Sequence, residues 1–292
     1  MPRVWIDTDI GSDVDDAVAL LCAARHPEIE VVGISLVMGR VDIRAWLAQE
    51  VMTRAGVSGL PVLPGAMDPM GPRTHEEPMP SYGRLAPELP PISPKDDDSR
   101  IAAVAEGMSG LSESFHLLTI GPLTNVGRLL RRAPDIAERW EGVTCMAGRL
   151  EGKAEYNVSA DAVAARIAFE RLRPRLVGLE TCSDALPRAE AERLLDGADP
   201  ASGFLLDCYR EYRAYLTWHD NPENAPLTLF DAITLLSLVQ PEAFDFQSVH
   251  VLVETDGRLR LTDDGAPVQY ALSRDWPAIK KNIAALLRGD GS

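Results

Sequence analysis

The first sixteen residues carry an unusual density of negative charge. An apolar run ends in five aspartates within ten positions, with Gly11 among them: Asp7, Asp9, Asp13, Asp15 and Asp16. Aspartates crowded at the end of a buried strand repel one another unless a cation neutralises them or some stay protonated. Carboxylate oxygens are the ligands that a hard divalent ion prefers. The sequence therefore predicts a metal site at a strand terminus.

The residues after this turn alternate between helical and strand patterns. Residues 14–25 place apolar side chains at helical spacing, with carboxylates in the first turn and Pro27 beyond the end. Residues 30–37 form a β-branched run, and residues 41–55 show a second helical pattern. This order predicts a parallel sheet, whose ligands lie beyond the carboxyl ends of its strands. The acidic turn lies at such an end.

The rest of the chain continues the α/β pattern without an internal repeat or a linker. A proline-dense loop covers residues 64–98, and loops of this length in compact domains are usually functional lids or mobile. Pro122 is expected in the first turn of a helix that ends at Arg132. Further strands are predicted at 60–63, 115–120, 143–147, 175–179, 249–253 and 258–261, and further helices at 99–108, 161–171, 187–218 with a break near Pro200, 230–238 and 276–287. We predict one α/β domain over residues 1–292, with a mostly parallel, Rossmann-like central sheet flanked by helices.

Charge and cysteine usage restrict the partners and the location. The chain has 29 Lys and Arg against 44 Asp and Glu, a formal charge of −15, which argues against nucleic acid and anionic membranes as partners. Its four cysteines are far apart and lack a zinc-type spacing, so reduced thiols are expected. The chain starts on a strand pattern without a signal-peptide pattern, and no apolar run reaches bilayer length. A cytoplasmic protein is the resulting expectation.

Roles for the aspartate-rich turn that do not involve this metal site fit the residues less well. Helix capping and solvated surface explain one aspartate before a helix but not five. An EF-hand loop counted from Asp7 requires glycine and glutamate where Ser12 and Val18 stand. A phosphatase of the haloacid dehalogenase type also has Asp-x-Asp after an apolar strand, but it requires Thr or Val at the position of Gly11. This class is kept as a lesser alternative.

Four short motifs follow one another along the chain. They are Asp7-Thr8-Asp9-Ile10-Gly11 with Asp15-Asp16, Ile120-Gly121-Pro122-Leu123-Thr124-Asn125, Glu155-Tyr156-Asn157 and Phe230-Asp231-Ala232. Together they resemble the nucleoside hydrolase family, the calcium-dependent, inosine/uridine-preferring N-ribohydrolases, over most of the chain. The resemblance implies hydrolysis of the N-glycosidic bond of a ribonucleoside or related N-riboside, and assembly as a homodimer or homotetramer.

The resemblance also implies a metal site and a base. Ca²⁺ would be held by Asp9, Asp16, Asp231 and the backbone carbonyl of Ile120, with waters and two ribose hydroxyls completing the oxygen ligands. Calcium would fix the ribose and acidify a water below the anomeric carbon. Asp9 would be the general base that takes the proton of this water.

The sugar contacts follow from the same resemblance. Asp13 or Asp15 would bond a ribose hydroxyl, and the extra residues in the turn leave this choice open. Glu155 and Asn157 would hold the 5′ and 3′ side of the sugar. Arg40 stands where the family has an asparagine that touches the sugar. It would either balance the acidic cluster or contact an anionic group of the substrate.

The leaving-group side is where the chain departs most from the family. Phe230 stands where one subgroup has a histidine proposed to protonate the leaving base. Good leaving groups would need no acid; otherwise an aromatic stack or a lid residue would assist. Trp218 and His219, at the end of a long helix, are candidates for this side, and His75 is a weaker lid candidate. A calcium-dependent ribosyl-ligand binder with little turnover is the main alternative function.

Overall fold

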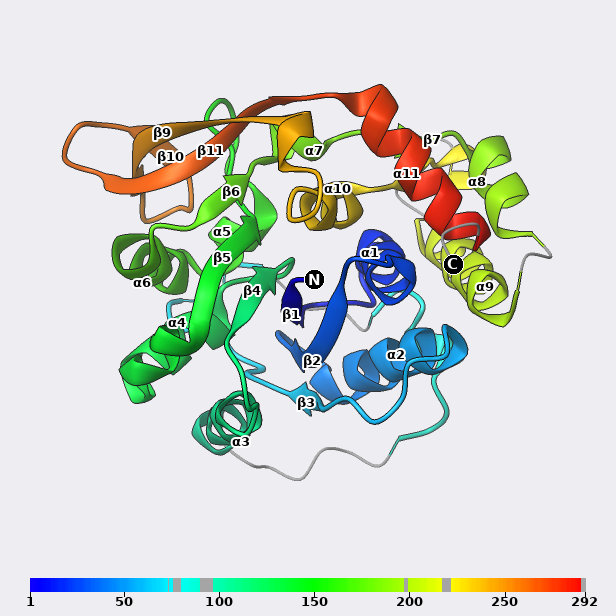
Figure 1. Cartoon of the computed structure of the whole chain (residues 1–292), viewed down its shortest axis with the longest axis horizontal. Helices are drawn as coiled ribbons and strands as arrows, with labels where there is room; N and C mark the ends of the chain where they lie inside the picture. Colours follow the sequence, from blue (N-terminus) through cyan, green and yellow to red (C-terminus); the bar gives the residue numbers. More distant parts are fainter. Residues whose placement is uncertain (73, 76–79, 90–96, 197–198, 217–221, 290–292) are drawn as a thin grey trace.

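The protein is built around one large, mostly parallel sheet. The computed structural model describes residues 1–292 except 73, 76–79, 90–96, 197–198, 217–221 and 290–292. Within the described residues the sheet has nine strands in the order β10-β9-β11-β6-β5-β4-β1-β2-β3, and β7 pairs with β8 separately (Figure 1). The strands are β1 (Arg3–Thr8), β2 (Glu30–Leu36), β3 (Val62–Pro64), β4 (Phe115–Thr119), β5 (Trp140–Met146), β6 (Arg175–Val177), β7 (Ala185–Leu186), β8 (Leu227–Thr228), β9 (Phe244–Val253), β10 (Leu259–Leu261) and β11 (Ala266–Arg274).

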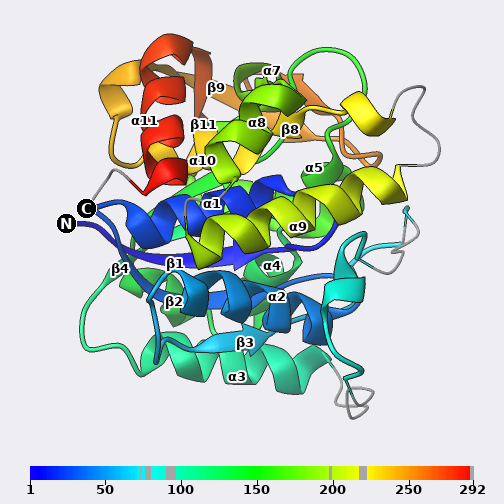
Figure 2. The same cartoon turned by 90° about the vertical axis from the view of Figure 1, so that its right-hand side faces the viewer.

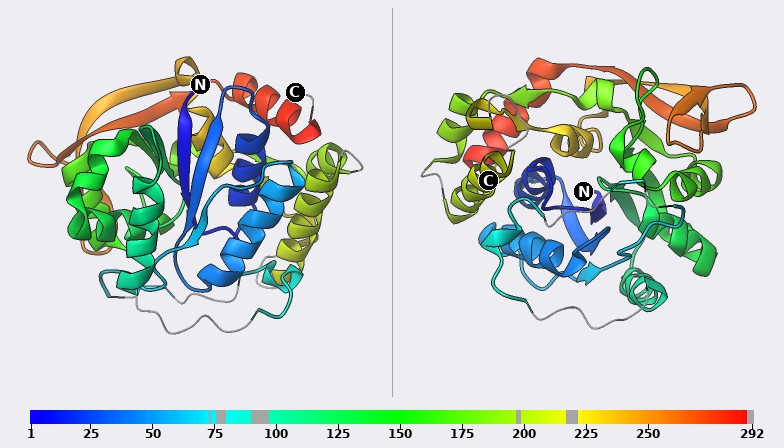
Figure 3. Two further views of the ribbon diagram at one scale, coloured as in Figure 1. Left: turned by 60° about the horizontal axis from the view of Figure 1, so that its bottom comes forward. Right: turned by 180° about the vertical axis from the view of Figure 1, so that it is seen from behind.

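The strand order reverses beside β1. The pairs in the series β3-β2-β1-β4-β5-β6-β11 are parallel, whereas β9 is antiparallel to both β10 and β11. β2 and β4 flank β1, and β1 and β2 run side by side in the same direction (Figure 3). In an open α/β sheet such a reversal leaves a crevice at the carboxyl ends of the strands, where ligands bind. The acidic turn begins at this crevice.

Helices cover both faces of the sheet. The helices are α1 (Asp15–Arg25), α2 (Val41–Arg54), α3 (Asp97–Ser109), α4 (Thr124–Arg132), α5 (Tyr156–Ala160), α6 (Ala162–Leu172), α7 (Leu179–Cys182), α8 (Arg188–Leu195), α9 (Pro200–Tyr215), α10 (Phe230–Leu236) and α11 (Trp276–Arg288). In Figure 1, α3, α4 and α6 lie on one side of the sheet, and α1, α2, α10 and α11 lie on the other. Figure 2 shows α9 as an outer layer over α1 and α2, with which it is in contact.

The strand β1 supplies both hydrophobic cores. Its side chains alternate between the two faces: Val4 and Ile6 pack in the core with α1, and Trp5 packs in the core with α3 and α4. All three are fully buried. This is why β1 is a continuous apolar run in the sequence, as strands covered on both faces are.

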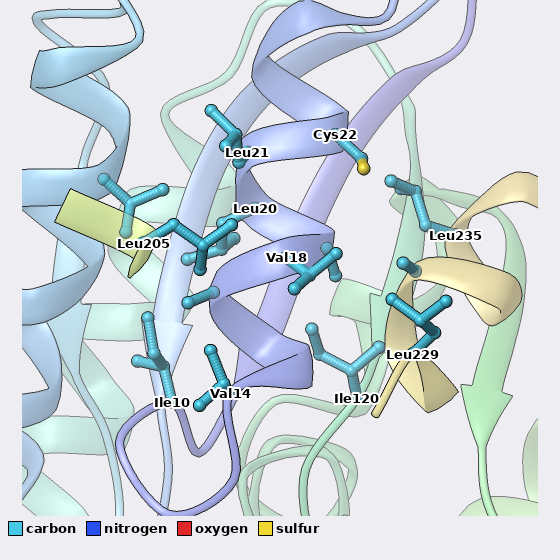
Figure 4. Close-up of a cluster of buried hydrophobic side chains, with 14 of the residues drawn as sticks. Ile10, Val14, Val18, Leu20, Leu21, Cys22, Ile120, Leu205, Leu229 and Leu235 are labelled. Atoms are coloured by element: carbon cyan, nitrogen blue, oxygen red, sulfur yellow. The ribbon is translucent and has the colours of Figure 1, made fainter. Parts of the chain in front are cut away.

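The helix α1 is buried on nearly every side. Nine of its eleven residues are buried, and it contacts α2, α9, α10 and α11. Figure 4 shows Val18, Leu20 and Leu21 of α1 facing side chains from different neighbouring elements, including Leu205 and Leu235. Because the burial extends to the first turn, the carboxyl groups of Asp15 and Asp16 are also removed from solvent.

Most of the predicted elements are confirmed, with local corrections. The hairpin of β9 and β10 pairs Leu259 with Val253, and the helical region 187–218 is broken by Asp199, which caps α9, and Pro200. The prediction for Pro122 is wrong, because α4 begins two residues later at Thr124. The strand expected to reach residue 179 ends at Val177.

Two elements were not anticipated from the sequence. β11 is a nine-residue strand that joins the antiparallel hairpin to β6, and α5 begins directly after Glu155. Their local patterns are weak: β11 follows a turn at Asp263-Asp264-Gly265, and α5 has only five residues. Within the described part of the chain, none of the helices combines the length and apolar character needed to span a bilayer.

Candidate active site

A pocket of about 650 Å³ opens at the carboxyl ends of the central strands. Asp9 follows β1, Ile120 follows β4 and Met146 ends β5, so the floor comes from the edge of the sheet beside the strand reversal. The described residues that line it are Asp9, Ser12, Asp13, Asp15, Asp16, His75, Ser81, Ile120, Met146, Glu155, Tyr156, Asn157, Leu179, Tyr212, Tyr215, Leu216, Phe230 and Asp231. Predicted site residues from four distant parts of the sequence therefore meet in one cavity.

The acidic turn is held in place by residues 80–82 of the proline-dense loop. Gly11 has a φ of +123°, and a Cβ there would lie 2.7 Å from the Cβ of Pro80. The hydroxyl of Ser81 donates to the carbonyl of Gly11 at 3.2 Å, and that of Tyr82 donates to the carbonyl of Asp13 at 3.1 Å. Glycine is required here because both the backbone conformation and the close approach exclude a side chain.

Three carboxylates form the tightest group. Asp15 and Asp16 in the first turn of α1 and Asp231 in the first turn of α10 each offer an oxygen atom, and these atoms lie within 4.8 Å of one another. The set predicted for the metal contained Asp9 in place of Asp15. Asp15 joins the group because it adjoins Asp16 on the same helix end, which faces α10. The hydroxyl of Thr8 donates to Asp16 and fixes its orientation.

The electrostatics of this group require a compensating positive charge or protons. Burial, followed by repulsion among the carboxylates, raises the pKa of Asp15, Asp16 and Asp231 well above the aspartate range. The charge of Asp9 contributes to all three shifts, so Asp9 belongs to the same electrostatic cluster. Buried oxygen donors in this arrangement fit a hard divalent cation.

Gly121 leaves room for the carboxylate of Asp9. A Cβ at position 121 would lie 2.7 Å from Asp9 Oδ1 and 2.8 Å from the Asp9 amide nitrogen. We expect Gly121→Ala to displace Asp9 and to lower kcat by on the order of 100-fold with the fold retained, because misplacement by an ångström has this cost. Gly203→Ala is the matched control, since no atom lies within 4 Å of its Cβ. Equal activity of the two variants in a hydrolysis assay would contradict this prediction.

A buried arginine that is missing from the predicted site supports the turn. Arg44 on α2 is fully buried, and it donates from Nε to the carbonyl of Met38 at 2.8 Å and from Nη1 to that of Ile10 at 2.9 Å. Its charge lowers the pKa of Asp16 against the larger effect of burial. Its spacing from Val41 and Leu47 places it on the apolar face of α2, which was the available signal.

Arg40 is placed differently from either expectation. Its guanidinium pairs with Asp42 of its own helix, with Nη2 and Oδ2 2.7 Å apart, and it is absent from the described lining of the pocket. The pair lowers the pKa of Asp42. In this arrangement its charge is compensated locally, outside the acidic cluster.

Replacement of these two arginines should separate their roles. Arg44→Met removes the donors of two buried carbonyls and a buried charge, so we expect the free energy of unfolding to fall by about 3–5 kcal/mol. Arg40→Met breaks a partly exposed pair and should cost only about 0–1 kcal/mol. Urea unfolding of both variants measures the difference, and a similar loss in both would show that the Arg44 contacts do not stabilise the turn.

The carbonyl predicted as a metal ligand is also a hydrogen-bond acceptor. Asn157 donates from Nδ2 to the carbonyl of Ile120 at 3.3 Å and to that of Met146 at 3.0 Å. The carboxylate of Glu155 accepts from the amides of Gly148, Asn157 and Val158 at 2.9, 2.6 and 3.1 Å. Burial raises the pKa of Glu155, and these bonds oppose the shift. Both side chains therefore shape the backbone that lines the pocket.

Asp7 lies behind the cluster and is absent from the described lining of the pocket. Its Oδ1 accepts from Asn125 Nδ2 at 2.7 Å and from the hydroxyl of Ser35, and burial raises its pKa to about 7. Asn125 also donates to the carbonyl of Leu36 at 3.1 Å and accepts from the amide of Ala66 at 2.8 Å. Asn125, whose side chain had no assigned role from sequence, therefore ties the ends of β1 and β2 together.

The upper walls of the pocket are largely aromatic. His75 contacts the Tyr156 ring with 5.1 Å between centroids, and its Nε2 lies 3.0 Å from Ser159 Oγ. Tyr212, near the end of α9, donates a hydrogen bond to the carboxylate of Asp13. Phe230 lines the cavity beside Asp231. Two predicted contacts, Trp218 and His219, lie outside the described residues.

Fold and pocket together define the class of the protein: an α/β enzyme with a carboxylate-lined small-molecule site at the reversal point of its sheet. The family model described as inosine-uridine preferring nucleoside hydrolase matches residues 4–281. The inosine-uridine preferring nucleoside hydrolase of Leishmania major is 30% identical over 277 residues, covering 89% of this chain and 86% of that protein. The probable uridine nucleosidase 1 of Oryza sativa subsp. japonica is 28% identical over 270 residues, covering 87% and 82%.

A solved structure has the same fold. The inosine-uridine preferring nucleoside hydrolase from Bacillus anthracis superposes with a TM-score of 0.80 at 19% identity, covering 99% of this chain and all of that one. The protein belongs to the nucleoside hydrolase family, as a divergent member. It is accordingly an N-glycosidase, and the predicted fold class is confirmed.

Proposed function

We propose that the protein hydrolyses the N-glycosidic bond of a ribonucleoside or close N-riboside, with Ca²⁺ at the floor of the pocket and Asp9 as the general base. The observation that carries this proposal is the meeting of Asp15, Asp16 and Asp231 beside Asp9, in a pocket of a nucleoside hydrolase fold. Relatives named for inosine and uridine support nucleosides as the substrate class.

The residues that would hold the ion are Asp9, Asp16, Asp231 and the carbonyl of Ile120, with Asp15 close enough to Asp16 to bind either the ion or a ribose hydroxyl. Bound calcium would neutralise part of the carboxylate charge, fix sugar hydroxyls and make water more acidic. The protein side chains then hold the sugar with its anomeric carbon towards Asp9.

Asp9 takes a proton from the water that attacks the anomeric carbon, as the bond from that carbon to the base nitrogen breaks. Positive charge develops on the sugar in this step, as it does when glycosides are hydrolysed. The carboxylates at the floor stabilise this charge, because they are fixed in place before the reaction and shielded from water. The start of α5, with Glu155 and Asn157, forms the wall on the sugar side.

The test is release of reducing sugar from uridine, inosine, cytidine and adenosine. We expect turnover of at least one nucleoside, loss of turnover with a chelator and recovery with Ca²⁺. Binding of a nucleoside without hydrolysis would favour the ribosyl-ligand binder instead. Phosphate release from an aryl phosphate with Mg²⁺ would favour the phosphatase alternative. A cytoplasmic location and a homodimer or homotetramer remain predictions, which fractionation and light scattering test.

A further inference from the structure

The pocket has a large excess of negative charge even with a metal ion bound. Six acidic side chains belong to its described lining, and none of the described lining residues is Lys or Arg. A divalent cation would offset two of these charges. Arg44, the cation that contacts the acidic turn, is fully buried and donates to backbone carbonyls there. A ligand in this cavity therefore meets a negative potential.

Asp13 directs part of this charge away from the metal group. It does not belong to the tight carboxylate group, it is only half-buried, and it lines the cavity. Its carboxylate accepts a hydrogen bond from Tyr212, and its backbone carbonyl accepts one from Tyr82 at 3.1 Å. These contacts fix a carboxylate on the side of the cavity that faces α9, where it is available to a ligand.

The described wall offers little to protonate a leaving group. Phe230, beside Asp231, has no exchangeable side-chain proton. The phenol proton of Tyr212 is donated to Asp13, and burial raises the pKa of this phenol further. The imidazole found in the described lining, that of His75, has its Nε2 occupied by Ser159 Oγ at 3.0 Å. A neutral base that must be protonated to leave is therefore poorly served.

We infer that the preferred substrates are N-ribosides whose leaving group already carries a positive charge, namely N-ribosylpyridinium compounds. Asp13 is then a specificity-determining residue that attracts the cationic ring. This inference rests on the proposed function. In the reaction, water oxygen bonds to the anomeric carbon and the electron pair of the C–N bond returns to the ring nitrogen. The ring leaves as a neutral pyridine, ribose remains, and one proton passes from water to Asp9 and then to solvent.

The experiment compares kcat/KM for three substrates: the N-riboside of nicotinamide, whose ring is cationic; the N-riboside of nicotinic acid, whose carboxylate cancels the ring charge; and uridine, which is neutral. We expect the wild type to prefer the nicotinamide riboside over the nicotinic acid riboside by roughly tenfold or more, the size of one charge interaction. Since pyridinium ribosides are intrinsically reactive, the decisive readout is how a variant changes the ratio between substrates.

Asp13→Asn should lower kcat/KM for the nicotinamide riboside by roughly tenfold more than for uridine. Tyr212→Phe, which keeps the charge but removes the phenol that orients it, should lower the same ratio less. Asp207→Asn on the exposed side of α9 is the control and should leave the ratio unchanged. A merely structural role of Asp13 would lower all three substrates alike, and thermal melting reports the state of the fold.

The outcomes separate the two proposals. Hydrolysis of uridine with an equal or lower rate on the nicotinamide riboside, or an unchanged ratio in Asp13→Asn, overturns the charge preference and leaves the proposed function standing. Failure to hydrolyse any N-riboside, natural nucleosides included, overturns the proposed function and this inference with it. A ratio that falls as stated supports both.

Discussion

Asp9→Asn should reduce kcat for nucleoside hydrolysis by about 100-fold to 10,000-fold, the range for loss of a general base. The amide keeps the shape and the hydrogen-bonding oxygen of the side chain but cannot accept the proton of water. Loss of a buried negative charge next to Asp15, Asp16 and Asp231 should meanwhile leave the metal-free fold as stable or more stable.

The assay is single-turnover hydrolysis at saturating Ca²⁺, because Asp9 is also a proposed ligand and a weaker metal affinity must not be mistaken for a lost base. Asp207→Asn, at an exposed position of α9, is the control for an aspartate-to-asparagine change. If Asp9→Asn retains wild-type kcat once calcium is saturating, another group is the base.

The metal-free protein should lose stability as the pH rises from 4 to 7. Burial raises the pKa of Asp7 from the usual 3.8 to about 7, so the folded state keeps a proton that the unfolded state has lost over this interval. Stability from this group is complete below pH 3.8 and is lost as the pH passes 7. The difference amounts to roughly 4 kcal/mol for Asp7 alone.

Urea unfolding in a chelator at three pH values, one near the usual aspartate pKa, one between and one above the raised value, measures this dependence. In Asp7→Asn the contribution of one group is absent, so the profile should be flatter than that of the wild type, with the remaining slope due to the cluster carboxylates. Asp207→Asn should keep the wild-type slope. Parallel profiles for wild type and Asp7→Asn would contradict the buried, protonated state of Asp7.

Much of the fold follows from local patterns in the sequence. The alternation of β1 and the helical spacing of α1 identify both elements, because periodicity reflects which faces are buried. β11 was missed because it is recognised by its partners: it closes the sheet between β9 and β6, and β6 lies far earlier in the chain. Pro122 was misplaced because helix ends are set by hydrogen bonds that residue preferences predict only approximately.

The site was predictable to a similar extent. Motifs identified residues that reach one pocket from the ends of β1 and β4 and from α5 and α10. The partners that hold them were not predictable, because Arg44 and Asn125 act through contacts with backbone atoms of distant segments. The grouping of Asp15 with Asp231 likewise depends on how α1 packs on α10, which sequence spacing does not specify.

The central claim is that the acidic turn and Asp231 together hold one divalent cation. Calorimetric titration of chelator-treated protein with Ca²⁺, for wild type, Asp231→Asn and Asp207→Asn, tests it most directly. We predict one Ca²⁺ per chain for wild type and Asp207→Asn, and binding weakened by at least about 100-fold in Asp231→Asn, since each carboxylate ligand contributes strongly to a site of this kind. Absence of calcium binding in the wild type, or equal binding by Asp231→Asn, would contradict the claim.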